Sequence, residues 1–147
     1  MNMRLLLIED QSSAVELTRR LLDGFTSRFD DAPTLQQGIE MALRHTYDVV
    51  ILDLRLADSE RDETIEAIPE VKAAARAPVV VMTGWPEEGI KERCMEAGAD
   101  GFVHKDEITT AILMAVQIAV QNATAKERTN TFSEHFSKLH QRLIGAA

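Results

Sequence analysis

Short apolar runs alternate along this chain with segments of helical periodicity, and this alternation constrains the fold more than any other feature. The clear runs are Leu5–Ile8, Val49–Leu52, Val79–Met82 and Gly101–Val103, and a weaker one lies around Ser27–Pro33. Continuous runs of β-branched residues bounded by turn residues are typical of strands that are buried on both faces, as in parallel sheets. The weaker run indicates an edge strand.

Between these runs, apolar residues recur at the spacing of one helix face. The faces are Ala14, Leu17, Leu21 and Phe25; Leu35, Ile39, Ala42 and Leu43; Ile65, Ile68 and Val71; Ile90, Cys94 and Ala97; and Ile108, Ile112, Ala115, Val116 and Ala119. Residues suited to helix ends agree with these limits. They are Ser13–Glu16 and Thr34–Gln37 with capping-box spacing, Pro86 for a first turn, and Gly24 and Gly98 for C-terminal caps.

Alternating strands and helices predict βαβ units, and therefore an α/β fold with a parallel sheet covered by helices on both faces. We expect a doubly wound (βα)₅ architecture of the flavodoxin-like type. Right-handed crossovers then place ligands at the carboxyl ends of the strands.

Polar residues follow four of the apolar runs at this carboxyl edge. Glu9 and Asp10 follow the first run, Asp53 the third, Thr83 the fourth and Lys105 the fifth. Crowded carboxylates repel one another unless a cation neutralises them, and oxygen-only ligands favour Mg²⁺ over zinc or copper. An ionised Asp53 is then a nucleophile, and Thr83 and Lys105 supply a hydroxyl and a second cation to a phosphoryl group.

The segments LLLIED, VVILDL, VVVMTG and GFVHK resemble the signature segments of the response-regulator receiver family, over residues 4 to about 122. The spacings from Asp53 to Thr83 and from Thr83 to Lys105 are those of the family. The resemblance implies that Asp53 accepts a phosphoryl group from a histidine kinase or a histidine phosphotransfer protein.

The resemblance also assigns roles to the other positions. Mg²⁺ would be bound directly by Asp10, Asp53 and the backbone carbonyl of Arg55, with Glu9 acting through water. Thr83 would move toward the phosphoryl group, and Phe102 occupies the position of the family's aromatic switch residue. That motion would remodel a surface made by the fourth helix, the fifth strand and the fifth helix, which a downstream protein would bind.

The chain departs from the family pattern near the site. Ala57 and Arg61 stand where the family usually has proline and glycine, and Asp62 stands at a usually apolar position. Asp106, rather than proline, follows Lys105, so we expect either a trans peptide bond or a strained cis one there. Asp106 is also suited to cap the fifth helix.

Two bulky residues flank the site, Arg55 two positions after Asp53 and Trp85 two after Thr83. One hypothesis is that they restrict the attacking water and prolong the phosphorylated state. The alternative for Trp85 is simple packing beside Pro86.

A phosphatase with an aspartyl nucleophile would place that residue after the first strand, with an acid two residues later. This pattern is absent from the segment IEDQS at residues 8–12, which follows the first apolar run.

The receiver would end near Asn122, so we divide the chain into a receiver domain at 1–122 and a helical extension at 123–147. In the extension, Phe132, Phe136, Leu139 and Leu143 recur at the spacing of one apolar helix face. This face predicts self-docking, a homodimer or a linker to an output domain.

Composition narrows the class of protein. The net charge of -8 argues against binding nucleic acid, the single Cys94 excludes an intrachain disulfide, and no apolar run is long enough to span a bilayer. We expect a cytoplasmic signalling protein that catalyses only its own phosphorylation and dephosphorylation. The alternatives are a receiver excised from a transcription factor or signalling enzyme, and a pseudo-receiver that acts only as an interaction module.

Overall fold

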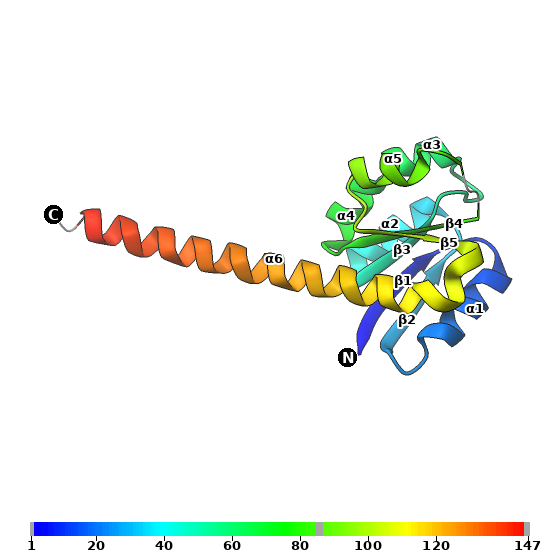
Figure 1. Cartoon of the computed structure of the whole chain (residues 1–147), viewed down its shortest axis with the longest axis horizontal. Helices are drawn as coiled ribbons and strands as arrows, with labels where there is room; N and C mark the ends of the chain where they lie inside the picture. The colour runs from blue at the N-terminus through cyan, green and yellow to red at the C-terminus, as the bar shows by residue number, and fades with distance from the viewer. Residues whose placement is uncertain (1, 85–86, 146–147) are drawn as a thin grey trace.

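The structure, a computed structural model, describes residues 2–84 and 87–145. Within these ranges, parallel strands and helices alternate along the chain (Figure 1). The strands are β1 (Met3–Ile8), β2 (Thr26–Ala32), β3 (Val49–Asp53), β4 (Val79–Thr83) and β5 (Gly101–His104). The helices are α1 (Ser12–Leu22), α2 (Leu35–Arg44), α3 (Arg61–Glu66), α4 (Ile68–Ala75), α5 (Ile90–Glu96) and α6 (Ile108–Gly145), with a 3₁₀ turn, η1 (Lys105–Glu107), before α6.

The strands form one five-stranded parallel sheet in the order β2-β1-β3-β4-β5. The predicted doubly wound fold is confirmed, and the weak run does form an edge strand. Every residue of β3 and β4 is buried, which is why both strands are continuous apolar runs rather than alternating ones.

Each face of the sheet carries its own hydrophobic core. Helices α2, α3, α4 and α5 cover one face, where Leu6, Leu52 and Val81 are buried. Helices α1 and α6 cover the other face over Leu7, Ile51 and Met82. The sheet is therefore enclosed on both sides, and its carboxyl edge is where polar side chains can gather.

The third helical segment differs from its prediction. The periodicity of Ile65, Ile68 and Val71 suggests one helix, but the structure has α3 and α4 joined at Ala67. Pro69 lies in the first turn of α4, where its missing N–H is harmless. Deeper inside a single helix, the same ring would clash with the preceding turn, so the helix breaks.

The predicted helix ends are partly right. Thr34 caps α2 by accepting a hydrogen bond from the Gln37 amide, as predicted. The prediction at Ser13 is wrong, because α1 begins at Ser12 and its N-cap is Gln11. Gly98 follows α5 with φ of 110°, in the left-handed region where a side chain would be strained, and the Ala99 amide bonds back to Cys94. Pro86 lies outside the described residues.

The start of the last helix corrects a second prediction. His104, not Asp106, acts as the cap, because its Nδ1 accepts a hydrogen bond from the Asp106 amide at the start of η1. The chain enters the 3₁₀ turn directly after β5, so Asp106 lies in the middle of this turn and not in the capping position before it. The Lys105–Asp106 peptide bond is trans, as are the other described peptide bonds.

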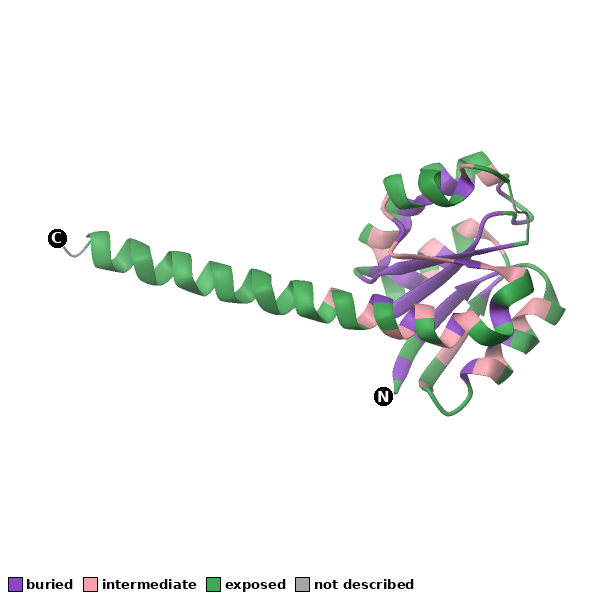
Figure 2. Cartoon of the chain, viewed as in Figure 1, coloured by how far each residue is buried: buried purple, intermediate pink, exposed green. Residues whose placement is uncertain are grey.

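Helix α6 continues far beyond the domain. Its 38 residues run without a break through the polar segment at 122–131, and its C-terminal half projects into solvent (Figures 1 and 2). Phe132, Phe136, Leu139 and Leu143 are all exposed, so the tail does not dock on its own domain.

Length and composition alone would allow the helical stretch Lys105–Gly145 to cross a membrane, since it contains an 18-residue window of mean hydropathy 1.3. Part of this apolar character has another explanation, because Ile108, Ile112 and Val116 pack on the sheet. One such helix is weak evidence for a membrane span.

Candidate functional site

Four strands deliver polar side chains to the carboxyl edge of the sheet. Glu9 and Asp10 follow β1 directly, Asp53 and Thr83 are the last residues of β3 and β4, and Lys105 follows β5. Glu9, Asp53 and Thr83 are buried, whereas Asp10 is exposed. Strands β3 and β4 are buried up to their last residues, so Asp53 and Thr83 are fixed in position at the edge.

Lys105 links two of the carboxylates. Its Nζ lies 3.0 Å from Glu9 Oε2 and 3.2 Å from Asp53 Oδ2. The Gln11 amide donates a hydrogen bond of 3.2 Å to the other Glu9 oxygen. The lysine is therefore already placed beside the carboxylate that was predicted to accept the phosphoryl group, although a trans peptide bond and an aspartate replace the usual proline arrangement after it.

The electrostatics of the cluster are unbalanced toward negative charge. Burial, and then the charge of Asp53, raise the pKa of Glu9 from 4.5 to about 7 despite the nearby ammonium of Lys105. For Lys105, burial disfavours the charged form, but Asp53 and Glu9 outweigh it and hold its pKa above the ordinary value. One lysine thus does not fully compensate the carboxylates, and part of the excess charge is met by proton uptake at Glu9.

The same carboxylates form a donor set for a divalent cation. Oxygen atoms of Glu9, Asp10 and Asp53 all lie within 4.8 Å of one another. A hard divalent cation with oxygen ligands and retained water suits such a set, and it would supply the positive charge that the cluster lacks. The exposure of Asp10 leaves one side of the set accessible to solvent and to an incoming ligand.

The loop after Asp53 is held by contacts that the sequence analysis did not find. Asp58 accepts hydrogen bonds from the Leu35 and Gln36 amides at the start of α2, at 2.8 and 3.1 Å. Within the loop, Leu56 and Ser59 form a backbone bridge, and the Ser59 hydroxyl lies 2.8 Å from that of Thr64. These contacts hold the loop although Ala57 and Arg61 replace the family's proline and glycine. The only sequence signal for these contacts is that Asp58 is a residue type that often caps helices; nothing in the sequence shows that it lies beside the start of α2.

Asp62, the other departure, lies in an exposed ion-pair network rather than in the core. Arg61 pairs with Glu87 and with Asp62, and Arg93 on α5 pairs with Asp62 at 3.1 Å. The network connects α3 to α5 across an open cleft of about 570 Å³ that is lined in part by Arg55, Arg61 and Glu87.

The remaining predicted site residues differ in how they are placed. Phe102 on β5 is partly buried and packs against the core beneath α2–α5. The Arg55 side chain is exposed beside the cleft. Trp85 lies outside the described residues, so the structure does not place it.

Comparisons with known proteins agree on one family. The family model of the response regulator receiver domain matches residues 5–117. In sequence, the chain is 34% identical over 100 residues to the KDP operon transcriptional regulatory protein KdpE of Escherichia coli, a match that covers 68% of this chain and 43% of that protein. The chain spans about half the length of the relatives that it matches.

Two solved structures show the same fold. One is a CheY-like response regulator receiver domain protein from Methanospirillum hungatei, with a TM-score of 0.73 and 17% identity, covering 86% of this chain and 99% of that one. The other is the receiver domain of a sensor histidine kinase from Pseudomonas aeruginosa, with a magnesium ion in its active-site cleft. Its TM-score is 0.69 at 21% identity, and the match covers 82% of this chain and 99% of that one.

Proposed function

The chain belongs to the response regulator receiver domain family of two-component signalling, and on that premise we propose that it is a phosphorylation switch whose acceptor is Asp53. The observation that carries the proposal is the position of Lys105, whose ammonium lies 3.2 Å from the buried Asp53 carboxylate at the edge of the sheet. A surface carboxylate without such a counter-charge would have no means of stabilising a transferred phosphoryl group.

The proposed reaction is transfer from a phosphohistidine of a kinase or a histidine phosphotransfer protein. An Asp53 oxygen bonds to phosphorus as the phosphorus–nitrogen bond of the donor breaks, and the leaving imidazole takes up a proton. Lys105 and the Thr83 hydroxyl stabilise the phosphoryl oxygens, because this chemistry depends mainly on positioning and on neutralising charge.

The proposed cofactor is Mg²⁺, held by Asp10, Asp53 and the backbone carbonyl of Arg55, with Glu9 acting through water. The P. aeruginosa receiver domain with magnesium in its cleft supports this choice of metal. When bound, the cation neutralises the carboxylates and the phosphoryl oxygens. The chain's own residues orient the acceptor, since Asp53 is fixed by its place at the end of β3.

The proposed output is a change in a protein-binding surface. Thr83 would move toward the phosphoryl group, and Phe102 would follow, so that α5, β5 and the first turns of α6 present a different surface to a downstream protein. We further propose that Arg55 and Trp85 limit the access of water to phosphorylated Asp53. The protein would act in the cytoplasm, without nucleic-acid binding and with no catalysis beyond its own phosphorylation and dephosphorylation.

Acetyl phosphate with Mg²⁺ tests the proposal directly. Intact-mass measurement should show the addition of one phosphoryl group to the wild-type chain and none to Asp53→Asn. Asp23→Asn is a matched control, because it removes the charge of an exposed carboxylate on the opposite edge of the domain and should label normally. A wild-type chain that gains no mass, or an Asp53→Asn chain that still gains it, would contradict the proposal.

Two other functions compete with a stand-alone switch. Relatives of which this chain spans only about half support the alternative of a receiver that works within a larger regulator. A pseudo-receiver that only binds partners is less well supported, because Glu9, Asp53 and Lys105 are buried or half-buried together at an energetic cost that a binding module has no reason to bear.

A further inference from the structure

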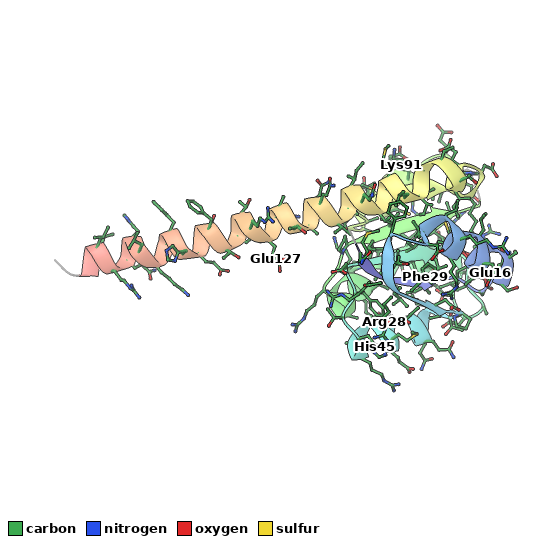
Figure 3. All side chains as sticks on the ribbon, turned by 90° about the horizontal axis from the view of Figure 1, so that it is seen from below. Glu16, Arg28, Phe29, His45, Lys91 and Glu127 are labelled. Carbon is green, nitrogen blue, oxygen red and sulfur yellow. The ribbon has the colours of Figure 1, made fainter. Side chains whose placement is uncertain are left out.

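An apolar stripe lies on the solvent side of α6 in two parts, which are separated by the polar segment at 122–131. On the C-terminal half, Phe132, Phe136, Leu139 and Leu143 are between 48% and 71% exposed. The stripe begins earlier, over the domain itself, where Met114 is 63% and Ile118 47% exposed on the same helix. Figure 3 shows the side chains beyond the domain pointing into solvent all around the helix.

The stripe faces away from the sheet. Ile112, Val116 and Ala119 point into the core. At 3.6 residues per turn, the stripe is displaced by roughly 150° around the helix axis from these core-facing positions. A second helix could therefore lie along the whole stripe without touching the sheet, and the two receiver domains would lie on outer, opposite sides of such a pair.

The stripe has the spacing of a coiled-coil seam. Positions repeat at alternating intervals of four and three residues, which is the heptad pattern of core positions a and d. In this register the a positions are Asn122, Thr129, Phe136 and Leu143, and the d positions are Ile118, Ala125, Phe132 and Leu139. Two exposed core positions per heptad make a narrow seam, which suits a partner helix better than the wider apolar face of a helix lying on a membrane.

The residues that flank the seam permit two identical helices to pair in parallel. In a parallel pair, each g position faces the e position five residues later on the other helix. These pairs are Gln121 with Lys126, Arg128 with Ser133, and His135 with His140, so no two permanently like charges meet.

Asn122 adds a register signal. A single asparagine at an a position hydrogen-bonds to its counterpart only when two parallel helices are in register, and it thereby selects two strands at some expense of stability. Burying the large side chains of the stripe on both helices would remove on the order of 1,000 Å² of surface from water, about the minimum for a biological interface.

From these observations we propose that α6 pairs with α6 of a second copy of this chain as a parallel, in-register two-stranded coiled coil from about Ile118 to Leu143. The pairing uses groups that are exposed in the unphosphorylated chain and does not depend on the chemistry at Asp53. A chain that is not phosphorylated would therefore not contradict the proposed dimer, and a monomeric chain would not contradict the proposed phosphorylation of Asp53.

Sedimentation equilibrium of the unphosphorylated wild-type chain, up to several hundred micromolar, measures the mass. We expect a dimer for the wild type and a monomer for the double variant Phe132→Glu/Phe136→Glu. The matched control is Asn130→Glu/Ser137→Glu, which adds the same charges to the same helix off the seam and should remain dimeric. A monomeric wild type, a trimer, or equal loss of the dimer in both variants would overturn the proposal.

Orientation needs a second measurement. Ala125→Cys places a thiol at a d position, where it meets its counterpart only in a parallel, in-register pair, so mild oxidation should give a covalent dimer. Glu127→Cys, on the outer side of the helix, should not cross-link, and the native Cys94 is buried. No cross-link at position 125 would reject the parallel register.

A monomeric wild-type chain that co-sediments with phosphatidylserine vesicles would assign the stripe to a membrane surface instead.

Discussion

At the scale of single residues, the cluster at the sheet edge carries more negative charge than its one lysine balances. Glu9 shows this most clearly, because it is 1% exposed and its pKa is raised to about 7 by burial and by Asp53. A glutamate kept partly protonated at neutral pH is unfavourable in a purely structural role. It becomes useful when a cation is to be bound, since the cation then restores the ionised form.

The raised pKa of Glu9 predicts how stability depends on pH without metal. Because the folded pKa of about 7 exceeds the ordinary 4.5, the folded state holds a proton that the unfolded state has lost between these values. The contribution of Glu9 to the free energy of unfolding is therefore complete below about pH 4.5 and falls as the pH rises toward 7, by at most about 3–4 kcal/mol at about 1.4 kcal/mol per pKa unit.

Urea unfolding of the wild type and of Glu9→Gln, in chelator across this pH range, checks the prediction. The difference between the two free energies of unfolding should fall with rising pH, since the glutamine has no proton to lose. Saturating Mg²⁺ should reduce the slope, because a bound cation keeps Glu9 ionised in the folded state. A difference that is flat or rises with pH in chelator would contradict the assignment.

Water access to the phosphorylated acceptor is a second question at this scale. If Arg55 and Trp85 shield Asp53, then Arg55→Ala and Trp85→Ala should each speed dephosphorylation several-fold, measured as the decay of phosphoprotein after the phosphodonor is removed. Arg44→Ala, an exposed arginine at the end of α2 on the opposite edge, is the control and should leave the rate unchanged. Unaltered decay in both site variants would show that bulk near the site does not control hydrolysis.

Which residues gather at the site could be predicted from the sequence, whereas how the following loop is held could not. Glu9, Asp53 and Lys105 each follow an apolar run, and parallel strands bring their carboxyl ends together by geometry alone. Asp58 gave no comparable signal, because its partners at the start of α2 are more than twenty residues away and their proximity depends on the packing of helices on the sheet.

At the scale of elements, helix starts explain how the active edge is stabilised. The first turn of α2 has amide groups without partners inside the helix. Thr34 accepts a hydrogen bond from Gln37, and Asp58 accepts from Leu35 and Gln36, so the loop after the phospho-acceptor also caps a neighbouring helix. The cap and the loop stabilise each other.

Asp58→Ala should therefore lower the free energy of unfolding by about 1–2 kcal/mol, as expected for loss of a capping carboxylate. It should also slow labelling by acetyl phosphate, because the loop that carries the Arg55 carbonyl loses its anchor. Thr34→Ala is the matched comparison, since it removes a cap from the same helix without touching the loop and should affect stability alone. Equal labelling rates in the two variants would contradict the prediction that the anchored loop contributes to phosphorylation of Asp53.

Element boundaries show where periodicity is a weak guide. Periodicity located the helices but not every buried face: Leu17, Phe25 and Leu43 of the predicted faces are exposed, whereas the buried residues of α1 are Thr18 and Leu22. Helices α3 and α4 share one apolar face and are nevertheless two helices, because Pro69 tolerates only a first-turn position. At the end of β5, the chain enters a 3₁₀ turn in which His104 takes the capping role predicted for Asp106. In both cases a local steric or hydrogen-bonding detail overrides a regular pattern.

At the scale of the whole molecule, the chain has two mechanical parts that share one helix. The first turns of α6 complete the core over the sheet, and the remainder leaves the domain as a rod (Figure 2). Ala119 is the last buried residue of α6, and the division that we propose between a receiver domain at 1–122 and an extension at 123–147 lies just beyond it. Because the helix does not break there, any tilt of α6 at the switch surface would be carried along the rod.

Removing the rod should consequently leave the receiver intact. We expect residues 1–123 to unfold at the same temperature as the full chain under dilute, monomeric conditions, and to accept phosphate from acetyl phosphate at the same rate. A shorter chain, residues 1–114, should be strongly destabilised, because it lacks Val116 and Ala119, which fill the core beneath α6. Circular dichroism melting and intact-mass labelling provide both readouts. If residues 1–123 melt several degrees lower than the full chain, the extension is part of the folding unit. If they are labelled more slowly, the extension affects the phosphorylation site itself.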